Sequence, residues 1–251
     1  MPDTAPSLAL RAELAGLNAS APPQQKEVDG WLIRLSPGKA KRSRCINALK
    51  AGSLPVDEVL ARCQRSFEAA GLPFIVRLTP WSQPPGLDER LAAKGWKSFD
   101  AADVLVLDHL TPDPAPAPIT PLDAQAYAAT VGALRGSSAK AIAAHAERTA
   151  NATVPYQGFG LFDSAGGLLA CGQIVREGSL VGLYDIASAR PRQGHAERLC
   201  RALLATAYAQ GAREAYLQVG CDNDAAQQLY RKLGFTWAYR YHYRSPTDLV
   251  D

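Results

Sequence analysis

The segment Asp185-Ile-Ala-Ser-Ala-Arg-Pro-Arg-Gln-Gly-His-Ala-Glu197 decides how the second half of this chain is interpreted. Residues 180–188 predict a strand and residues 196–210 predict a helix with an apolar stripe, so Gly194 lies in a tight loop between them. Free amides at a helix N-terminus bind phosphate groups, and glycine lets a phosphate approach the backbone. The segment therefore predicts an anion site, whereas an ordinary strand-to-helix turn is the competing interpretation of a single glycine.

Helices and strands alternate on both sides of this segment. Residues 123–150 are rich in alanine and predict one or two helices, and residues 158–163 and 168–176 predict a hairpin. Downstream, a strand, a helix and a last strand are predicted at 215–219, 224–233 and 235–243. This order predicts a mixed α/β sheet.

The first half of the chain shows the same order of elements. A helix, a strand, a helix and a strand are predicted at 54–70, 74–78, 87–94 and 102–110, after a hairpin at 31–35 and 42–46. Lys94-Gly95-Trp96 corresponds to Leu233-Gly234-Phe235, because each lies where a helix ends and a strand begins. We therefore infer an internal duplication.

A proline-rich stretch separates the two halves. Residues 111–121 hold five prolines, which favour an extended chain and donate few backbone amides to a sheet. The predicted organisation is an N-terminal domain at 1–110, a linker at 111–121 and a second domain at 122–251.

Composition excludes several classes of protein. With 27 basic and 24 acidic side chains the net charge is only +3, which argues against nucleic acid or a membrane surface as the main partner. No run of 18 apolar residues is present, and the first residues of the sequence predict no export. Five cysteines without a C-x-x-C pair predict reduced thiols in the cytoplasm, and four histidines without ligand spacing predict no metal site.

Two motifs resemble those of one enzyme superfamily. Pro191-Arg-Gln-Gly-His-Ala196 resembles the acyl-CoA loop Q/R-x-x-G-x-G/A of the GNAT superfamily of acyl-CoA-dependent N-acetyltransferases, with proline at its first position as a departure. Residues 223–235, Asn-Asp-Ala-Ala-Gln-Gln-Leu-Tyr-Arg-Lys-Leu-Gly-Phe, resemble the second motif of that superfamily. The resemblance covers about 118–251, and residues 29–110 look like the degenerate N-terminal half of two-part members.

The resemblance implies a fold, a reaction and a set of site residues. The fold is tandem GNAT-like domains, each a twisted mixed, mostly antiparallel sheet flanked by helices. The reaction is direct attack of a primary amine on acetyl-CoA, with Tyr230 as general acid. The implied cofactor-binding residues are Ile186, Ala187, Ser188, Arg192, Gln193, Gly194, His195, Ala196, Glu197 and Asn223. The first half, which has Leu91 where the second has Tyr230, is expected not to catalyse.

The two catalytic assignments have alternatives. Tyr230 either donates a proton to the leaving thiolate or simply packs beside its leucine neighbours. Asp185 is the best candidate for the base because strand alternation puts it on the same face as Leu183, but it could equally cap the strand or pair with an arginine. Water is a further proton acceptor.

The competing function is a non-catalytic acyl-CoA-binding or metabolite-binding module, because Pro191 weakens the loop. A dinucleotide-binding domain is excluded, since no G-x-G-x-x-G follows a strand. As an enzyme, the protein is expected to acetylate a small-molecule or peptide amine. The sequence leaves the acceptor open and is compatible with a homodimer.

Overall fold

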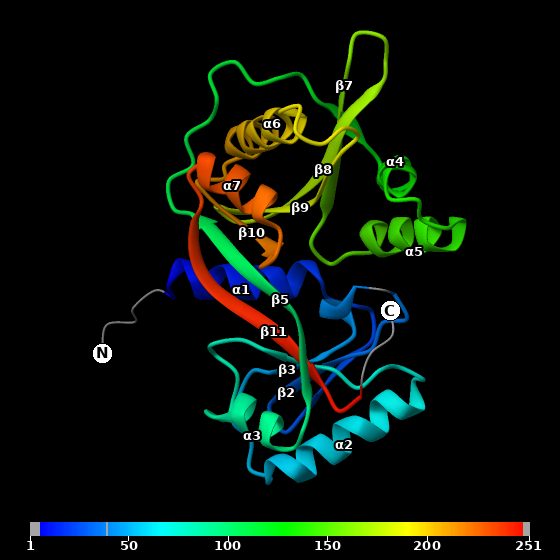
Figure 1. The fold of residues 1–251 in the computed structure, drawn as a ribbon, viewed down its shortest axis with the longest axis vertical. Helices are drawn as coiled ribbons and strands as arrows, with labels where there is room; N and C mark the ends of the chain where they lie inside the picture. The colour runs from blue at the N-terminus through cyan, green and yellow to red at the C-terminus, as the bar shows by residue number, and fades with distance from the viewer. Residues whose placement is uncertain (1–5, 39, 248–251) are drawn as a thin grey trace. The chain divides into compact units, whose positions relative to one another are not determined.

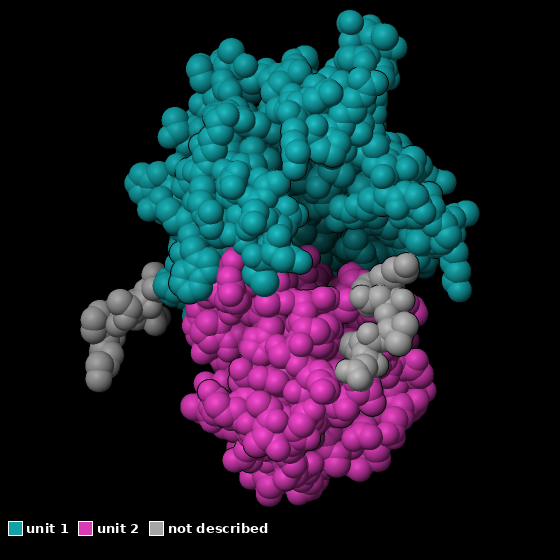
Figure 2. Space-filling view, in the orientation of Figure 1, with its two compact units in different colours: residues 1–19, 104–238 teal, residues 20–103, 239–251 magenta. Residues whose placement is uncertain are grey.

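The computed structural model describes residues 6–38 and 40–247, which form two compact units coloured separately in Figure 2. Unit 1 contains residues 6–19 and 104–238. Unit 2 contains the described residues of 20–103 together with 239–247. The strands β5 (Lys97–Leu107) and β11 (Thr236–Ser245) each contribute residues to both units.

Unit 1 is a mixed sheet with helices on both faces (Figure 1). Its strand order is β5-β10-β9-β8-β7-β6, in which β9 and β10 are parallel and β6 to β9 are antiparallel. Its other elements are α1 (Leu8–Ala19), β6 (Thr120–Leu122), α4 (Ala124–Leu134), α5 (Ala139–Ala150), β7 (Tyr156–Phe162), β8 (Leu168–Glu177), β9 (Leu180–Ser188), α6 (His195–Ala209), β10 (Glu214–Gly220) and α7 (Asp224–Lys232).

The two faces of this sheet bury different side chains. On one face, α6 packs Leu199 and Leu203 against Ile174 of β8 in the main core. On the other face, α4 packs Tyr127 against Cys171 of β8. Because side chains alternate along a strand, β8 supplies apolar groups to both helices, and the sheet is covered on both sides.

Unit 2 is also built on strands of mixed direction. Its strand order is β1-β2-β3-β4-β11-β5, with β3 and β4 parallel and with β4 and β11 antiparallel. Its other elements are β1 (Gln25–Val28), β2 (Trp31–Arg34), the 3-10 helix η1 (Lys41–Ser43), β3 (Ile46–Ala48), α2 (Val56–Ala69), β4 (Val76–Leu78) and α3 (Leu87–Ala93). Trp31, Phe67 and Leu91 are almost fully buried in its core.

Most predicted helices and strands lie within a few residues of their predicted bounds, and the predicted GNAT-like mixed sheets are confirmed. The first hairpin differs. Its second strand is β3 at Ile46–Ala48, because residues 41–43 form a 3-10 turn instead of an extended segment. The helix α1 was not predicted from the sequence.

The two units differ from the predicted division of the chain. Residues 111–119 lie within unit 1, where Ile119 packs against the main core, so this proline-rich stretch does not connect the units. The end of β11, with Tyr241 and Tyr243 buried, pairs with β4 and completes the sheet of unit 2. The last strand of the second half therefore belongs largely to the unit built from the first half.

A carboxylate closes the loop before α2 in unit 2. Asp29 and Gly30 form the tight β1–β2 turn with positive φ angles of 47° and 85°. The Asp29 carboxylate accepts hydrogen bonds from the Ser53 amide at 3.0 Å, the Leu54 amide at 2.9 Å and the Ser53 hydroxyl at 3.1 Å. The hydrogen bonds from Ser53 and Leu54 lower the pKa of the Asp29 carboxyl.

This lowered pKa makes a pH-dependent contribution to stability. A carboxyl whose pKa is lower in the folded chain stabilises the fold above its ordinary pKa of about 4, and the contribution disappears as pH falls through the folded value. Asparagine tolerates the positive φ at this position. We expect Asp29→Asn to lower Tm at pH 7 by a few degrees, and we expect this difference in Tm to become smaller at acid pH. Thermal melts from pH 7 to pH 3 measure the difference. Asp108→Asn, whose side chain is 82% exposed, is the control. A Tm difference that is constant with pH would contradict the assignment.

Candidate active site

The strands β9 and β10 separate within unit 1. They pair in parallel from Leu180↔Glu214 to Leu183↔Leu217, and the pairing stops there although β9 continues to Ser188. Beyond the fork, β9 keeps only its pairing with β8. The edge of β9 that faces β10 therefore presents backbone groups to which an extended, amide-containing ligand can add as a strand does.

A β-bulge lies directly beyond the fork. Asp185 has a φ of +52°, and it lies with Ile186 opposite the single residue Gly172 of β8. A side chain at Gly172 would collide with Ile186, because a Cβ there would lie 2.5 Å from the Ile186 Cδ1 atom. The Tyr127 hydroxyl of α4 donates a hydrogen bond to the Asp185 carbonyl oxygen at 3.0 Å. Tyr127 thus holds the backbone of the bulge from one face of the sheet, and the glycine leaves room for Ile186 on the other face.

The bulge changes the face on which Asp185 lies. Simple alternation places its side chain with Leu183, which is buried in the core beneath α6. Instead, the carboxylate lies on the opposite face, where its Oδ1 accepts a hydrogen bond from Arg135 Nη1 at 3.2 Å. The prediction of a shared face is wrong, because the extra residue of the bulge shifts the alternation by one. The contact with Arg135 agrees with the alternative interpretation, in which Asp185 pairs with an arginine.

A histidine from α5 lies beside the same carboxylate. His145 of α5 places Nε2 at 3.4 Å from Asp185 Oδ2, an ion-pair distance without hydrogen-bond alignment. Burial lowers the pKa of His145, and the nearby Asp185 carboxylate opposes this effect. Nothing in the spacing of His145 and Arg135 along the chain identified them, because only the packing of α4 and α5 on the sheet brings them to Asp185.

The N-terminus of α6 has the features of an anion site. Gly194 is its N-cap residue with a φ of +74°, and no side chain caps the helix. By contrast, Asp123, Ser138 and Asn223 cap α4, α5 and α7. A Cβ at Gly194 would meet no atom within 4 Å, so the glycine is required by its φ and the space above it is open. These uncapped amides fit the phosphate groups of acyl-CoA.

The other predicted cofactor-binding residues surround this loop. Ile186 packs toward the core under α6 and Ala187 toward α4, so the two side chains point to opposite faces. The Ser188 hydroxyl donates to the Arg190 carbonyl oxygen at 3.0 Å. Arg192, Gln193, His195 and Ala196 lie in the loop and the first turn of α6, where His195 Nε2 lies 3.1 Å from Gln193 Oε1.

Glu197 connects two helices. Its carboxylate pairs with Lys232 of α7 at 2.6 Å and with Arg201 of α6 at 3.2 Å. The hydrogen bond from Lys232, followed by that from Arg201, lowers the pKa of Glu197 against the effect of burial. The structure thus places Glu197 in ion pairs that hold α6 against α7.

Tyr230 combines packing with an available hydroxyl. The residue is 7% exposed, and its ring lies 6.1 Å from that of Phe235. Burial, and to a lesser degree the Cys200 thiol, raises the pKa of Tyr230, so the hydroxyl stays protonated. In the described part of the chain this hydroxyl has no hydrogen-bond partner. Asn223 caps α7 by accepting a hydrogen bond from the Ala226 amide at 3.1 Å.

The corresponding region of unit 2 is occupied by the chain itself. The amides of Ser53 and Leu54, which precede α2, already donate to Asp29. The Ala48 carbonyl oxygen at the end of β3 accepts a hydrogen bond from the Gln83 amide at 2.9 Å. Groups that are available in unit 1 are therefore paired in unit 2.

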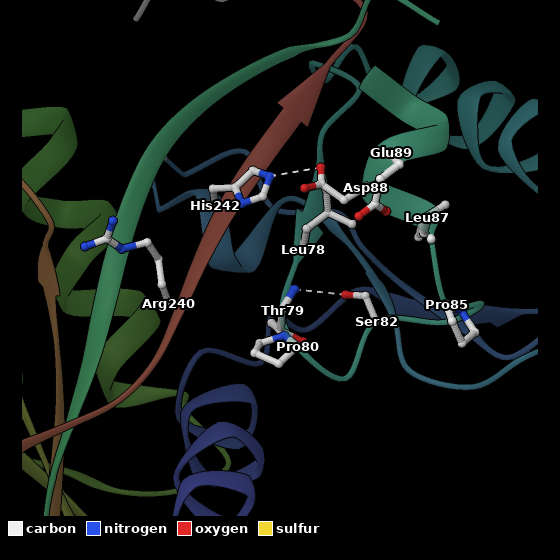
Figure 3. Close-up of a pocket in the computed structure, with 11 residues that line it drawn as sticks. Leu78, Thr79, Pro80, Ser82, Pro85, Leu87, Asp88, Glu89, Arg240 and His242 are labelled. Carbon is white, nitrogen blue, oxygen red and sulfur yellow. Dashed lines mark hydrogen bonds and ion pairs between the residues drawn. The ribbon is translucent and has the colours of Figure 1, made fainter. Parts of the chain in front are cut away.

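A pocket of about 380 Å³ lies in unit 2 between β4, β11 and the start of α3 (Figure 3). His242 points to Asp88, with Nε2 at 3.1 Å from Oδ1, and Arg244 also binds Asp88. Thr79 donates its amide to the Ser82 hydroxyl at 2.9 Å. None of the predicted site residues lines this pocket.

Residues 6–38 and 40–247 bring no three His, Cys, Asp or Glu side chains together as metal ligands. They also contain no helix that is long and apolar enough to cross a membrane.

Comparison with solved structures identifies the fold. A GCN5-related N-acetyltransferase from Kribbella flavida is 18% identical with a TM-score of 0.67, and the match covers 96% of this chain and 98% of that one. A second, from Sphaerobacter thermophilus, is 16% identical with a TM-score of 0.59 over 78% of this chain and 69% of that one. A tandem GNAT protein from the clavulanic acid biosynthesis pathway is 16% identical with a TM-score of 0.57 over 77% and 70%. At these identities the likeness shows the GNAT fold.

Comparison of sequences identifies the family. No curated protein matches the chain. The family described as "Probable histone acetyltransferase Rv0428c C-terminal" matches residues 10–244, which is nearly the whole chain and includes both units. The predicted membership of the GNAT superfamily is confirmed, and the chain belongs to this acetyltransferase family.

Proposed function

We propose that this protein transfers the acetyl group of acetyl-CoA to a primary amine of a small molecule or a peptide. The observation that carries the proposal is the fork between β9 and β10 beside the uncapped N-terminus of α6. The fork offers backbone groups for the amides of the cofactor, and the helix offers amides and a positive dipole for its phosphates. The family description names histones, so lysine side chains of proteins belong among the acceptors to be tested.

The residues of the loop divide the work of binding. The amides that follow Gly194 bind phosphate oxygens, and Arg192, exposed in the same loop, adds a positive charge. The backbone of Ile186 and Ala187 aligns the cofactor along the free edge of β9. When bound, acetyl-CoA supplies an acetyl group activated as a thioester. Holding this group and the amine in one site removes most of the entropic cost of their meeting.

Tyr230 donates the proton that the departing sulfur needs. Its buried hydroxyl keeps its proton at neutral pH, because burial disfavours the phenolate. A protonated donor beside the sulfur stabilises the developing thiolate without a covalent enzyme intermediate. Asp185 and the side chains around it lie beyond the fork and serve the amine side of the reaction.

A non-catalytic acyl-CoA-binding module is the alternative, and one observation favours it. Pro191 has no backbone N–H, so the loop offers one amide fewer than the superfamily pattern does. Such a module would bind acetyl-CoA without consuming it. The proposed location in either case is the cytoplasm, on the pattern of the cysteines.

The role of Tyr230 is tested by Tyr230→Phe. We expect kcat to fall by about 10²-fold or more, because a general acid is lost, while the Kd for acetyl-CoA stays unchanged. Release of free CoA thiol is measured over a panel of small amines, lysine peptides and histone peptides. Tyr208→Phe is the matched control. Tyr208 also lies in a helix, α6, and the centre of its ring is 4.1 Å from the guanidinium carbon of Arg213.

The results of this experiment separate the two functions. Unchanged kcat in Tyr230→Phe would remove Tyr230 from the mechanism. Stabilisation of the protein by acetyl-CoA without turnover of any amine would favour the binding module instead.

The phosphate site is tested by Gly194→Ala. A φ of +74° costs alanine about 1–2 kcal/mol, so the backbone at residue 194 is expected to shift. The amides of the loop then move away from the phosphate groups, and we expect acetyl-CoA to bind about 10-fold more weakly. Calorimetric titration measures the Kd. Gly178→Ala introduces the same kind of strain, at a φ of +58° in the β8–β9 turn, and is expected to leave the Kd unchanged. Equal weakening in both variants would show that the effect comes from general destabilisation.

A further inference from the structure

We propose that His145 is the base that takes the proton of the acceptor amine, and that Asp185 is the positioning residue that holds its imidazole. This inference rests on the proposed acetyl transfer and names the group that was left open on the amine side. The position of His145 along the chain predicts no role for it. Its role follows from where the folding of α4, α5 and β9 places three charged or titratable groups.

Arg135, Asp185 and His145 form a row beside the bulge. One carboxylate oxygen of Asp185 accepts a hydrogen bond from Arg135 at 3.2 Å, and the other lies 3.4 Å from His145 Nε2. The carboxylate is fixed as well through its backbone, because its carbonyl oxygen accepts a hydrogen bond from Tyr127. With one oxygen held by Arg135 and the other facing His145, Asp185 is placed to orient the histidine ring.

One ring nitrogen of His145 faces the carboxylate of Asp185. Nε2 is buried and faces the carboxylate, whereas the side chain as a whole is 17% exposed. A proton on Nε2, oriented toward Asp185, leaves the lone pair of Nδ1 for the amine. The ring also packs edge-on against Tyr127, at 6.0 Å between centroids, which fixes its plane. The 3.4 Å contact is the ion-pair contact through which Asp185 positions the ring when the ring becomes charged.

Groups on four elements act on the charge of His145. Burial lowers its pKa most, Asp185 of β9 raises it, and Arg148 of α5 and Arg135 beyond α4 lower it. Gln173 of β8 also raises the pKa of His145, because a hydrogen-bond acceptor near the ring favours its protonated form. The net pKa lies below the ordinary value, so the imidazole is neutral near pH 7 and ready to accept a proton.

A buried acceptor is available to the protonated ring. Gln173 is 1% exposed, and its Oε1 atom has no hydrogen-bond partner in the described part of the chain. An unpaired buried acceptor is costly, and it gains a partner when an adjacent imidazole becomes charged. Gln173 and the Asp185 carboxylate therefore lie ready to stabilise the imidazolium that proton transfer creates.

The proton and electron pairs balance without any further reactant. An ammonium acceptor first loses one proton to Nδ1 of His145, which leaves the amine nitrogen with a free electron pair. This nitrogen forms the bond to the acetyl carbon, the bond from that carbon to sulfur breaks, and the sulfur takes the proton of the Tyr230 hydroxyl. The second amine proton and the proton on His145 leave through solvent, while Tyr230 regains its own, so one proton is released per amide formed from an ammonium.

The first test compares acceptors of different basicity. Ethanolamine is an ammonium at pH 7 and needs a base, whereas methoxyamine is already neutral. We expect His145→Gln to lower kcat/KM by about 10²- to 10⁴-fold with ethanolamine and by much less with methoxyamine. His109→Gln, at a histidine that is 92% exposed, is the control and leaves both values unchanged. An equal loss with both acceptors would show a merely structural role and overturn the proposal.

The second test needs no turnover. NMR titration of the four histidines, with the His145 signal identified by its loss in His145→Gln, gives the pKa of His145 directly. We expect a value below the ordinary one, and a still lower value in Asp185→Asn because the carboxylate that favours the imidazolium is gone. An ordinary value, or one that Asp185→Asn does not move, would overturn the proposal.

The two proposals fail in different ways. Turnover that depends on Tyr230 but not on His145 would overturn the assignment of the base alone. Absence of turnover with ethanolamine, methoxyamine and every other amine of the panel would overturn the proposed acetyl transfer, and the assignment of the base with it.

Discussion

The separation of β9 from β10 after Leu183 is the constraint on which the candidate site depends. A parallel pair normally uses the backbone groups of both strands, so a strand that leaves its partner must either satisfy these groups elsewhere or offer them to a ligand. The apolar contacts of β8 and β9 with α6 keep β9 in the sheet while this edge stays open. The bulge at Asp185, with Gly172 opposite and Tyr127 bonded to its carbonyl, fixes the direction of the strand beyond the fork.

The two units show how one arrangement of elements can be open or closed to a ligand. In unit 1 the amides at the start of α6 have no capping side chain, and Gly194 leaves open space above them. In unit 2 the carboxylate of Asp29 already occupies the equivalent amides before α2. A bound carboxylate satisfies the same backbone donors that a phosphate would need, so unit 2 has lost the electrostatic basis for binding one.

Burial shifts the pKa values of Tyr230 and His145 in opposite directions. A low-dielectric surrounding disfavours the charged form of any side chain, whether that form is an anion or a cation. It raises the pKa of Tyr230, which keeps its proton, and lowers the pKa of His145, which stays without one. In the proposed mechanism, this single physical effect supplies a proton donor for the departing sulfur and a proton acceptor for the amine.

The sequence by itself determined the local features of this protein. Helix periodicity and turn glycines predicted most elements, and Gly194, Tyr230 and Asn223 were predicted as site residues from two short motifs that resemble those of the GNAT superfamily. Tertiary structure alone decided the rest. The pairing of β11 with β4 and the meeting of His145 with Asp185 depend on contacts between distant segments. The bulge that turned Asp185 away from Leu183 depends on the register between β8 and β9. The spacing of residues along the chain shows neither the contacts between distant segments nor this register.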